Sequence, residues 1–196
     1  MYVSSYRMNG VDVYLGTWNR GNRSEEGQQR IYAGKRYIIN HELYDDDTIV
    51  NDIALIKLPA PIFSTTTLPK FDSAGNYKTY EGVLATASGW GDTEDGFSAD
   101  ILRFIEKPIS KFSSCNLRYL GGLNSEQQIC QQATQKQNTC SGDSGGPLVV
   151  FEDGEPILIG ATSFGINLGC QSGWPGVFTR ITGYLDWIQR HTGIDV

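Results

Sequence analysis

Short runs of β-branched, aliphatic and aromatic residues, most of them closed by glycine or proline, recur along this 196-residue chain and favour an all-β fold. The runs occupy residues 11–15, 37–39, 53–58, 83–88, 101–109, 147–151, 157–164 and 176–180. The 23 glycines provide the turns between them. Residues 62–70 read as a connector, residues 110–119 are compatible with a short helix, and apolar residues at helical spacing predict a terminal helix over 182–191. Many strands with one terminal helix favour a β-barrel or a β-sandwich.

The charge balance excludes two classes of partner. The net charge is −6 at pH 7, whereas nucleic acids and acidic membrane surfaces attract basic patches. No apolar run approaches the roughly eighteen residues expected of a membrane-spanning helix. We therefore expect neither nucleic acid nor membrane as a partner.

The four cysteines are an even number in a glycine-rich β chain, which suits two disulfides and an oxidising compartment. No C-x-x-C pair is present and both histidines lie far from any cysteine pair, so we expect no metal site and no cofactor. The sequon Asn22-Arg23-Ser24 permits a glycan if the protein is secreted. The first seven residues have neither the basic start nor the apolar run of an export signal, so the opening of the chain does not match its cysteines.

The segment Gly142-Asp143-Ser144-Gly145-Gly146-Pro147 carries the sharpest chemical signal. A serine hydroxyl is a poor nucleophile unless a base takes its proton. The attack places negative charge on the carbonyl oxygen, and backbone N–H groups beside the serine can stabilise that oxyanion where glycine allows a close approach. A glycine-rich turn with an incidental serine is the competing interpretation.

This hexapeptide resembles the nucleophile segment of the trypsin/chymotrypsin family of serine proteases. Four more segments resemble that family: residues 51–58 (NDIALIKL), 88–91 (SGWG), 175–180 (PGVFTR) and 184–188 (YLDWI). All five motifs stand in the family's order and at about its spacing. The resemblance implies two six-stranded antiparallel β-barrels with the active site in the cleft between them. Residues 1–70 would form a partial first barrel, and residues 71–196 the second barrel with the terminal helix.

The resemblance also assigns roles to single residues. Ser144 is the expected nucleophile, Asp52 is the buried carboxylate that orients a histidine, and the N–H groups of Gly142 and Ser144 form the oxyanion hole. Asp143 is expected to bind the α-amino group that activation releases. By family position, the disulfides are Cys115–Cys130 and Cys140–Cys170.

The family's pocket positions fall in the last third of the chain. Asn138 stands at the pocket floor beside Thr139, and Gly165 and Gly176 stand at its walls. A neutral floor offers no charge to Arg or Lys, and glycine walls leave room for a large side chain. We therefore expect a preference for apolar, aromatic or other uncharged substrate side chains. The segment Ser163-Phe164-Gly165 is expected to pair with the substrate backbone as an added strand.

Two parts of the family's machinery are not matched. The histidines of the chain are His41, only eleven residues before Asp52, and His191 in the terminal helix, and neither stands at the family's histidine position. The family's Ile-Val-Gly-Gly-like start is not matched either. We therefore expect the chain as given to be an inactive, N-terminally truncated fragment with an incomplete first barrel. Thr17 stands near where some relatives carry a calcium-binding glutamate, so no calcium is expected.

The resemblance leaves two functions open. The first is a secreted, monomeric serine endopeptidase that acts on proteins or peptides and is open to protein protease inhibitors. The second is a non-catalytic homologue that works as a binding or cofactor protein. Such homologues usually lose a catalytic residue by substitution within a complete domain, whereas Ser144 and Asp52 are both present here. A purely structural β module would not need the Ser144 segment.

Overall fold

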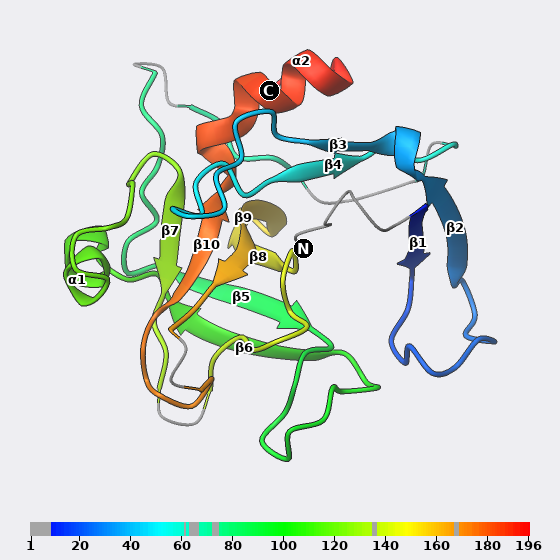
Figure 1. Ribbon diagram of the computed structural model, residues 1–196, viewed down its shortest axis with the longest axis horizontal. Helices are drawn as coiled ribbons and strands as arrows, with labels where there is room; N and C mark the ends of the chain where they lie inside the picture. The colour runs from blue at the N-terminus through cyan, green and yellow to red at the C-terminus, as the bar shows by residue number, and fades with distance from the viewer. Residues whose placement is uncertain (1–8, 61, 63–66, 72–74, 135–136, 167–168) are drawn as a thin grey trace.

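Strands dominate the structure, a computed structural model that describes residues 9–60, 62, 67–71, 75–134, 137–166 and 169–196 (Figure 1). The first part contains β1 (Gly10–Leu15), β2 (Gln29–Gly34), the 3₁₀ turn η1 (Lys35–Tyr37), β3 (Ile38–Asn40) and β4 (Ala54–Ile56). The second contains β5 (Leu84–Gly89), β6 (Arg103–Pro108), α1 (Phe112–Arg118), β7 (Gln128–Gln131), β8 (Pro147–Glu152), β9 (Glu155–Phe164), β10 (Gly176–Arg180), the 3₁₀ turn η2 (Ile181–Tyr184) and α2 (Leu185–Thr192). Within these described ranges, no helix has the length and apolar character that crossing a bilayer requires.

The second part forms one six-stranded antiparallel sheet in the order β6-β5-β8-β9-β10-β7. Its two outermost strands meet just beyond their ends, because Ile109 pairs with Gln131 in an isolated bridge. Ser110 N donates to Cys130 O at 2.9 Å, and Gln132 N donates to Pro108 O at 2.9 Å. These bonds join the sheet to itself at that end, as a barrel requires.

The first part forms two separate hairpins, β1–β2 and β3–β4, rather than one continuous sheet. Val11 and Ala33 make a small core with Val13, Tyr37 and Ile38 packed against it. An incomplete first barrel is therefore what the described strands present.

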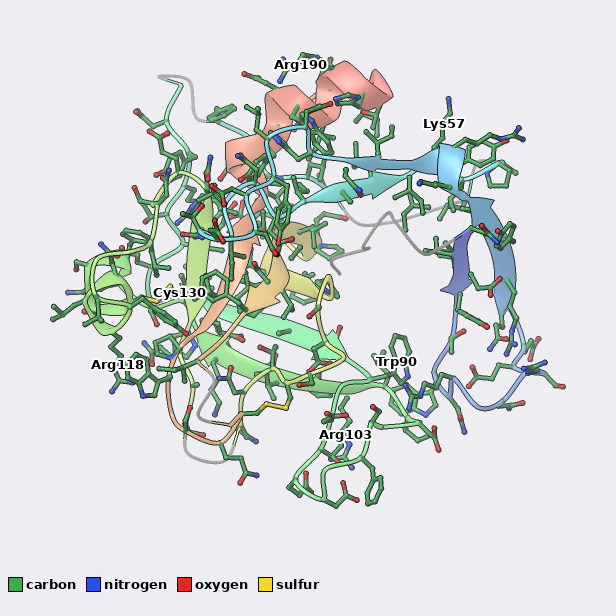
Figure 2. All side chains as sticks on the ribbon, viewed as in Figure 1. Lys57, Trp90, Arg103, Arg118, Cys130 and Arg190 are labelled. Atoms are coloured by element: carbon green, nitrogen blue, oxygen red, sulfur yellow. A yellow bond between two sulfur atoms is a disulfide. The ribbon has the colours of Figure 1, made fainter. Side chains whose placement is uncertain are left out.

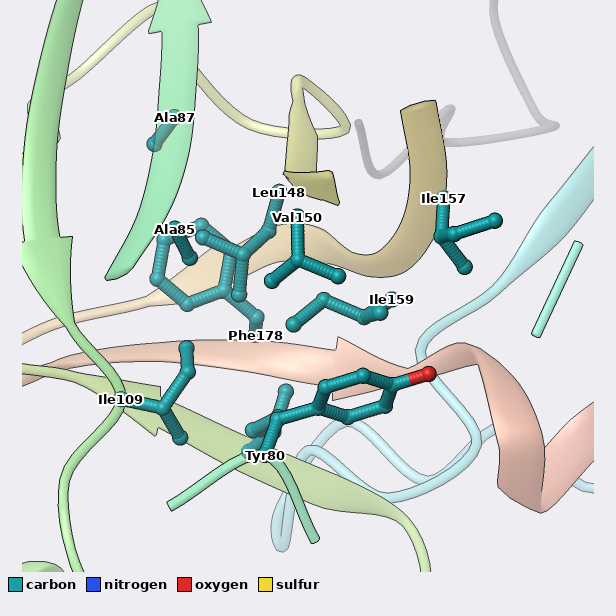
Figure 3. Close-up of a cluster of buried hydrophobic side chains, with 10 residues drawn as sticks. Tyr80, Ala85, Ala87, Ile109, Leu148, Val150, Ile157, Ile159 and Phe178 are labelled. Carbon is teal, nitrogen blue, oxygen red and sulfur yellow. The ribbon is translucent and has the colours of Figure 1, made fainter. Parts of the chain in front are cut away.

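The main hydrophobic core lies inside the six-stranded sheet (Figure 3). Alternate residues of β5, β8 and β9 point inward, as the period of two along a strand dictates. The buried members are Tyr80, Ala85, Ala87, Ile109, Ile129, Leu148, Val150, Ile157, Ile159 and Phe178. Ala85 and Val150 pack in this core as ordinary apolar side chains.

A second cluster joins the two parts of the molecule. Ile181, Tyr184, Leu185, Trp187 and Ile188 are its buried members, all from η2 and α2. Residues of β3, β4 and β9 pack against them: Ile39, Leu55, Leu158 and Ala161. Because α2 packs against both the β3–β4 hairpin and the large sheet, it fixes the position of the residues just before β4.

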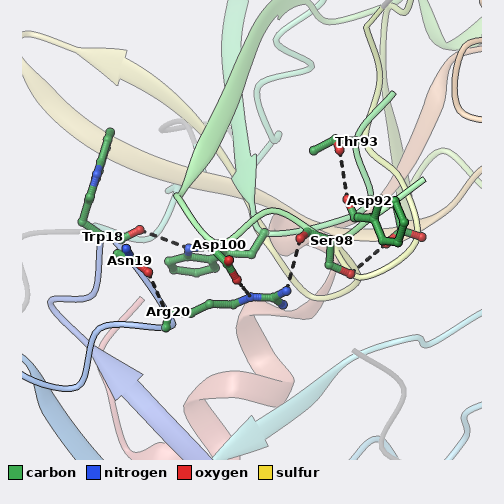
Figure 4. Close-up of polar contacts among 10 residues, drawn as sticks. Trp18, Asn19, Arg20, Asp92, Thr93, Ser98 and Asp100 are labelled. Carbon is green, nitrogen blue, oxygen red and sulfur yellow. Dashed lines mark hydrogen bonds and ion pairs between the residues drawn. The ribbon is translucent and has the colours of Figure 1, made fainter. Parts of the chain in front are cut away.

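The loop between β1 and β2 also contacts the second part (Figure 4). Trp90 Nε1 donates to Trp18 O at 3.2 Å, and Leu102 N donates to the same oxygen at 2.8 Å. Arg20 N donates to Asp100 O at 3.0 Å, and the two side chains form an exposed ion pair at 3.4 Å. The first hairpin is thus attached to the large sheet through the loops at its edge.

The two disulfides pair as the family resemblance implies. Cys115 in α1 is bonded to Cys130 in β7, and Cys140 is bonded to Cys170. Figure 2 shows Cys130 on β7 beside α1, which carries Arg118. The first bridge holds α1 on the sheet, and the second joins the loop before Ser144 to the loop before β10.

The expected elements are largely confirmed, but two strands were missed and the terminal helix begins later than expected. The strands β2 and β7 were not expected, because β2 begins with Gln29-Arg30 and buries only Ala33, and β7 carries a buried glutamine at each end, Gln128 and Gln131. The terminal helix begins at Leu185 rather than at 182, because residues 181–184 form the 3₁₀ turn η2. The connector expected over 62–70 lies partly outside the described residues, and its Thr67 forms a parallel bridge with Ile157.

Candidate active site

The Ser144 loop is held against β9 by backbone hydrogen bonds. Gly145 N donates to Thr162 O at 2.7 Å, and Thr162 N donates to Gly146 O at 2.8 Å. Thr162 Oγ1 adds a second bond to Gly146 O at 3.1 Å. A Cβ at Gly146 would lie 2.8 Å from both Asp143 O and Ser88 O, so only glycine fits there. The loop that carries Ser144 is therefore fixed on a strand, and Ser144 itself is exposed.

Gly142 stands two residues before Ser144 in a conformation that favours glycine. Its φ is +91°, and a Cβ would also lie 3.2 Å from Gly91 Cα. A left-handed backbone at this position reverses the chain just before the nucleophile. That geometry is compatible with an N–H pair from Gly142 and Ser144 aimed at one oxygen.

The carboxylate of Asp143 binds two backbone N–H groups. Oδ1 accepts from Gly91 N at 2.8 Å and Oδ2 accepts from Cys140 N at 2.9 Å. Side chains at Gly89 or Gly91 would collide with this carboxylate, since a Cβ at Gly91 would lie 2.5 Å from its Cγ. Asp143 therefore has partners other than an activation amine, because backbone donors from two loops bind its carboxylate.

Asp52 precedes β4 yet is bound to the large sheet. Ser163 Oγ on β9 donates to Asp52 Oδ2 at 2.6 Å, and Thr179 Oγ1 on β10 donates to Asp52 O at 2.6 Å. Asp52 Oδ1 accepts no hydrogen bond from the described residues. One carboxylate oxygen is thus anchored and the other is available to a further donor.

Ser144 and Asp52, 92 residues apart in the sequence, are both anchored on the end of β9. Thr162 holds the glycines that follow Ser144, and its neighbour Ser163 holds Asp52. Since adjacent residues of one strand carry both anchors, the strand brings together the two residues that the sequence singled out.

The backbone before Asp52 is strained and is held by polar side chains. Ile49 and Asn51 have positive φ angles of 52° and 56°, which cost most residues about 1–2 kcal/mol. Asn51 Nδ2 donates to Leu43 O at 2.7 Å. Its Oδ1 accepts from Gln127 Nε2 at 3.1 Å and from the Tyr184 hydroxyl at 3.3 Å.

Sequence reasoning did not select the side chains that hold this turn. Gln127 precedes β7, and Tyr184 ends η2. Burial raises the pKa of Tyr184 to about 12, so its hydroxyl stays protonated and can donate to Asn51. Gln127 and Tyr184 carry no local sequence signal of this role, because their common partner, Asn51, lies more than seventy residues away in the chain.

Both histidines have partners away from Ser144. The His41 ring stacks on Trp187 with centroids 5.1 Å apart, and its Nδ1 accepts from Leu43 N at 3.2 Å. His191 Nε2 lies 3.0 Å from Glu42 Oε1. Burial lowers the pKa of His41, and the positive charge of Arg190 lowers it further, although Glu42 opposes both effects. Neither ring is hydrogen-bonded to Ser144 or Asp52.

Three of the four expected pocket residues, Asn138, Thr139 and Gly176, lie close together. Asn138 Nδ2 donates to Trp174 O at 3.0 Å, and its Oδ1 accepts from Thr139 N at 2.9 Å. A Cβ at Gly176 would lie 3.0 Å from Asn138 Oδ1, whereas a Cβ at Gly165 would meet nothing within 4 Å. A cavity of about 1130 Å³ is lined by Asn138 and Thr139 together with Asp143.

Phe164 is the last residue of β9 and packs among aromatic and apolar side chains. Its ring meets Tyr119 edge-on at 5.8 Å between centroids, and it packs against the Cys115–Cys130 bridge and Val177. Phe164 is therefore a structural support for the end of β9 as well as an expected contact of substrate.

Sequence comparisons with known proteins match nearly the whole chain. The family model described as Trypsin matches residues 3–188. Brachyurin from Leptuca pugilator is 38% identical, and the alignment covers 94% of this chain and 78% of brachyurin. Serine protease 1 from Drosophila melanogaster is 41% identical, with 83% of this chain and 61% of that protein covered.

A solved collagenase structure shares this fold, and a collagenase is also among the sequence relatives. The structure of HL collagenase superposes with a TM-score of 0.80 at 34% sequence identity, covering 95% of this chain and 78% of the collagenase. The collagenase from Hypoderma lineatum is 37% identical over 94% of this chain and 68% of its own length. The chain thus spans about three fifths to four fifths of the relatives that it matches.

Proposed function

The chain belongs to the trypsin family of serine proteases, and we propose that the protein acts as a serine-type endopeptidase with Ser144 as its nucleophile. The observation that carries this proposal is the double anchorage on β9. Thr162 fixes the Ser144 loop and Ser163 binds the Asp52 carboxylate. A partly buried carboxylate and an exposed serine, both anchored to one strand end, are what acyl transfer through an imidazole needs.

In this proposal Ser144 Oγ attacks the carbonyl carbon of the scissile peptide while an imidazole takes its proton. Asp52 Oδ1, which no described residue uses, accepts the N–H of that imidazole and holds its orientation. The backbone N–H groups of Gly142 and Ser144 stabilise the oxyanion, and the positive φ of Gly142 supports that geometry.

The base in this proposal is neither His41 nor His191. Both are held by α2 and the turn around Glu42, so neither supplies an imidazole to Ser144. We therefore expect the 196-residue chain, produced by itself, to be inactive. Without a base, catalysis by the oxyanion hole and binding alone reaches about 10³–10⁴ over the uncatalysed reaction.

The pocket favours uncharged substrate side chains. The Asn138 amide is committed to Trp174 O and Thr139 N, and no carboxylate stands at this position to pair with Arg or Lys. The open space at Gly165 supports a large apolar or aromatic side chain. Two of the relatives are a collagenase and a brachyurin, which supports proteins as substrates. Ser163, Phe164 and Gly165 pair with the substrate backbone.

Secretion and a monomeric state complete the proposal. Two disulfides suit the oxidising route of secreted proteins. Protein inhibitors that present an extended segment to β9 are further expected partners.

A non-catalytic homologue is the second candidate function. The engagement of both histidines in structural contacts favours it, because an exposed Ser144 without a base is not a nucleophile. Such a protein would use the same cleft to bind a partner without cleaving it.

Labelling with a serine-reactive phosphonate distinguishes the two candidates. The native protein, purified from the organism that makes it and treated with an activating protease, should be labelled and should cleave peptides with apolar or aromatic side chains. Ser144→Ala should abolish both, while the neighbouring exposed Ser141→Ala should retain both. A native protein that takes no label after activation would favour the non-catalytic homologue.

A further inference from the structure

The loop between β1 and β2 contains a modification site that is independent of the cleft, and we propose that Asn22 carries an N-linked glycan. Asn22-Arg23-Ser24 is the only N-x-S/T sequon in the sequence. Figure 1 shows this loop at the turn of the β1–β2 hairpin, on the side away from α2.

The structure leaves the sequon accessible. Asn22, Arg23 and Ser24 are all exposed. Asn22 Oδ1 accepts a hydrogen bond from Ser24 N at 3.0 Å, whereas its Nδ2 donates to no group in the described part of the chain. The nitrogen that would carry the sugar is therefore free, and the oxygen that remains after modification keeps its bond.

Other asparagines illustrate the difference. Asn51 Nδ2 donates to Leu43 O at 2.7 Å, and Asn138 Nδ2 donates to Trp174 O at 3.0 Å. A sugar on either nitrogen would replace one of its two N–H groups where the amide holds a turn in place. The amide nitrogen of Asn22 makes no such contact in the described part of the chain.

The other hydrogen bonds of the loop do not use the Asn22 side chain. Glu25 accepts from Trp18 N at 3.0 Å and from Asn19 N at 2.8 Å. Gln28 Nε2 donates to the backbone oxygen of Asn22 at 3.0 Å. These bonds involve the backbone of Asn22 and its neighbours, so a glycan would extend into solvent without displacing a packed group.

The chemistry is a group transfer with no redox change. Asn22 Nδ2 forms a bond to the anomeric carbon of a sugar carried on a polyprenyl diphosphate. The bond between that carbon and the phosphate oxygen breaks, the diphosphate leaves with the electron pair, and one amide proton passes to a base. The donor is found in the secretory compartment where disulfides such as Cys115–Cys130 also form.

The test needs no peptidase activity and separates this proposal from the proposed function. The chain, with a signal peptide appended, is translated in the presence of endoplasmic-reticulum microsomes. We expect the protease-protected product to run as a single heavier band that endoglycosidase returns to the unmodified mobility. Because the transfer occurs on the nascent chain, the result does not depend on complete folding.

Matched variants assign the site. Asn22→Gln and Ser24→Ala should abolish the shift, whereas Ser24→Thr, which keeps the hydroxyl, should retain it. Asn40→Gln, which changes an exposed asparagine outside any sequon, should also retain it. A protected wild-type chain at the unmodified mobility, or a heavier band that persists in Asn22→Gln, would overturn the proposal.

Discussion

Ser163 Oγ on β9 donates a 2.6 Å hydrogen bond to Asp52 Oδ2, and this bond joins residues 111 positions apart. It connects the short N-terminal sheet to the large sheet at the point where the Ser144 loop is also attached. The geometry of the candidate site therefore depends on the packing between the two parts of the molecule.

Removing this hydrogen bond should weaken both stability and the site. A hydrogen bond to a charged group contributes about 1.5–3 kcal/mol, so we expect Ser163→Ala to lower the free energy of unfolding by that amount. Urea denaturation of the chain measures it. Ser172 is the matched control, because its buried Oγ has no hydrogen-bond partner among the described residues, so Ser172→Ala should cost little. Equal losses in the two variants would contradict the role given to the Ser163–Asp52 bond.

A side chain at Gly91 should displace the Asp143 carboxylate. The added Cβ would lie 2.5 Å from Asp143 Cγ, so we expect Gly91→Ala to cost about 1–3 kcal/mol, as overpacking commonly does. In the native activated protein it should also reduce phosphonate labelling of Ser144, since Asp143 and Ser144 share one loop. Gly34→Ala is the control, because its Cβ would meet only atoms 3.9 Å away. A Gly91→Ala protein as stable as Gly34→Ala would show that the carboxylate can move freely.

The strained turn before Asp52 predicts that two substitutions of Asn51 will differ in stability in the opposite order to the usual one. Asn51→Ala and Asn51→Gly both remove the bonds to Leu43, Gln127 and Tyr184. Only glycine tolerates the positive φ of 56° without strain. We therefore expect Asn51→Gly to be more stable than Asn51→Ala by about 1 kcal/mol, although glycine is normally the less favourable residue. Chemical denaturation of both variants checks this order, and a more stable alanine variant would contradict the strained turn.

His41 should make stability depend on pH near neutrality. Burial lowers its pKa below the ordinary value of 6.5, so the unfolded chain binds a proton at a higher pH than the folded chain does. The free energy of unfolding should therefore fall as the pH is lowered through 6.5 towards the folded-state pKa. Charged groups near the ring are Glu42, Arg190 and His191.

Urea denaturation between pH 5 and 8 tests this dependence. We expect His41→Gln to flatten the profile in that range and His191→Gln to leave most of it in place. A profile that His41→Gln leaves unchanged would contradict the role given to His41.

The local sequence was sufficient to predict the strands, turns and motifs that a few neighbouring residues specify. Glycine and β-branched patterns predicted most strands, and Asp153-Gly154 predicted the β8–β9 hairpin, which closes with positive φ at both residues. The segment around Ser144 and the family order of five motifs identified the expected nucleophile and carboxylate. The strand β7 was missed because its buried residues include Gln131, whose amide is satisfied by Ala85 O at 2.7 Å rather than by water.

Only the tertiary structure decided which distant residues contact one another. Sequence patterns report which side chains prefer burial, but they do not say which polar groups will face each other once the chain has closed. Asn51 finds Gln127 and Tyr184, His41 finds Trp187, and Asp143 finds the amide of Gly91 only because the sheet and α2 bring these segments together. The chemistry of the site was therefore determined by residue type, and its geometry by packing.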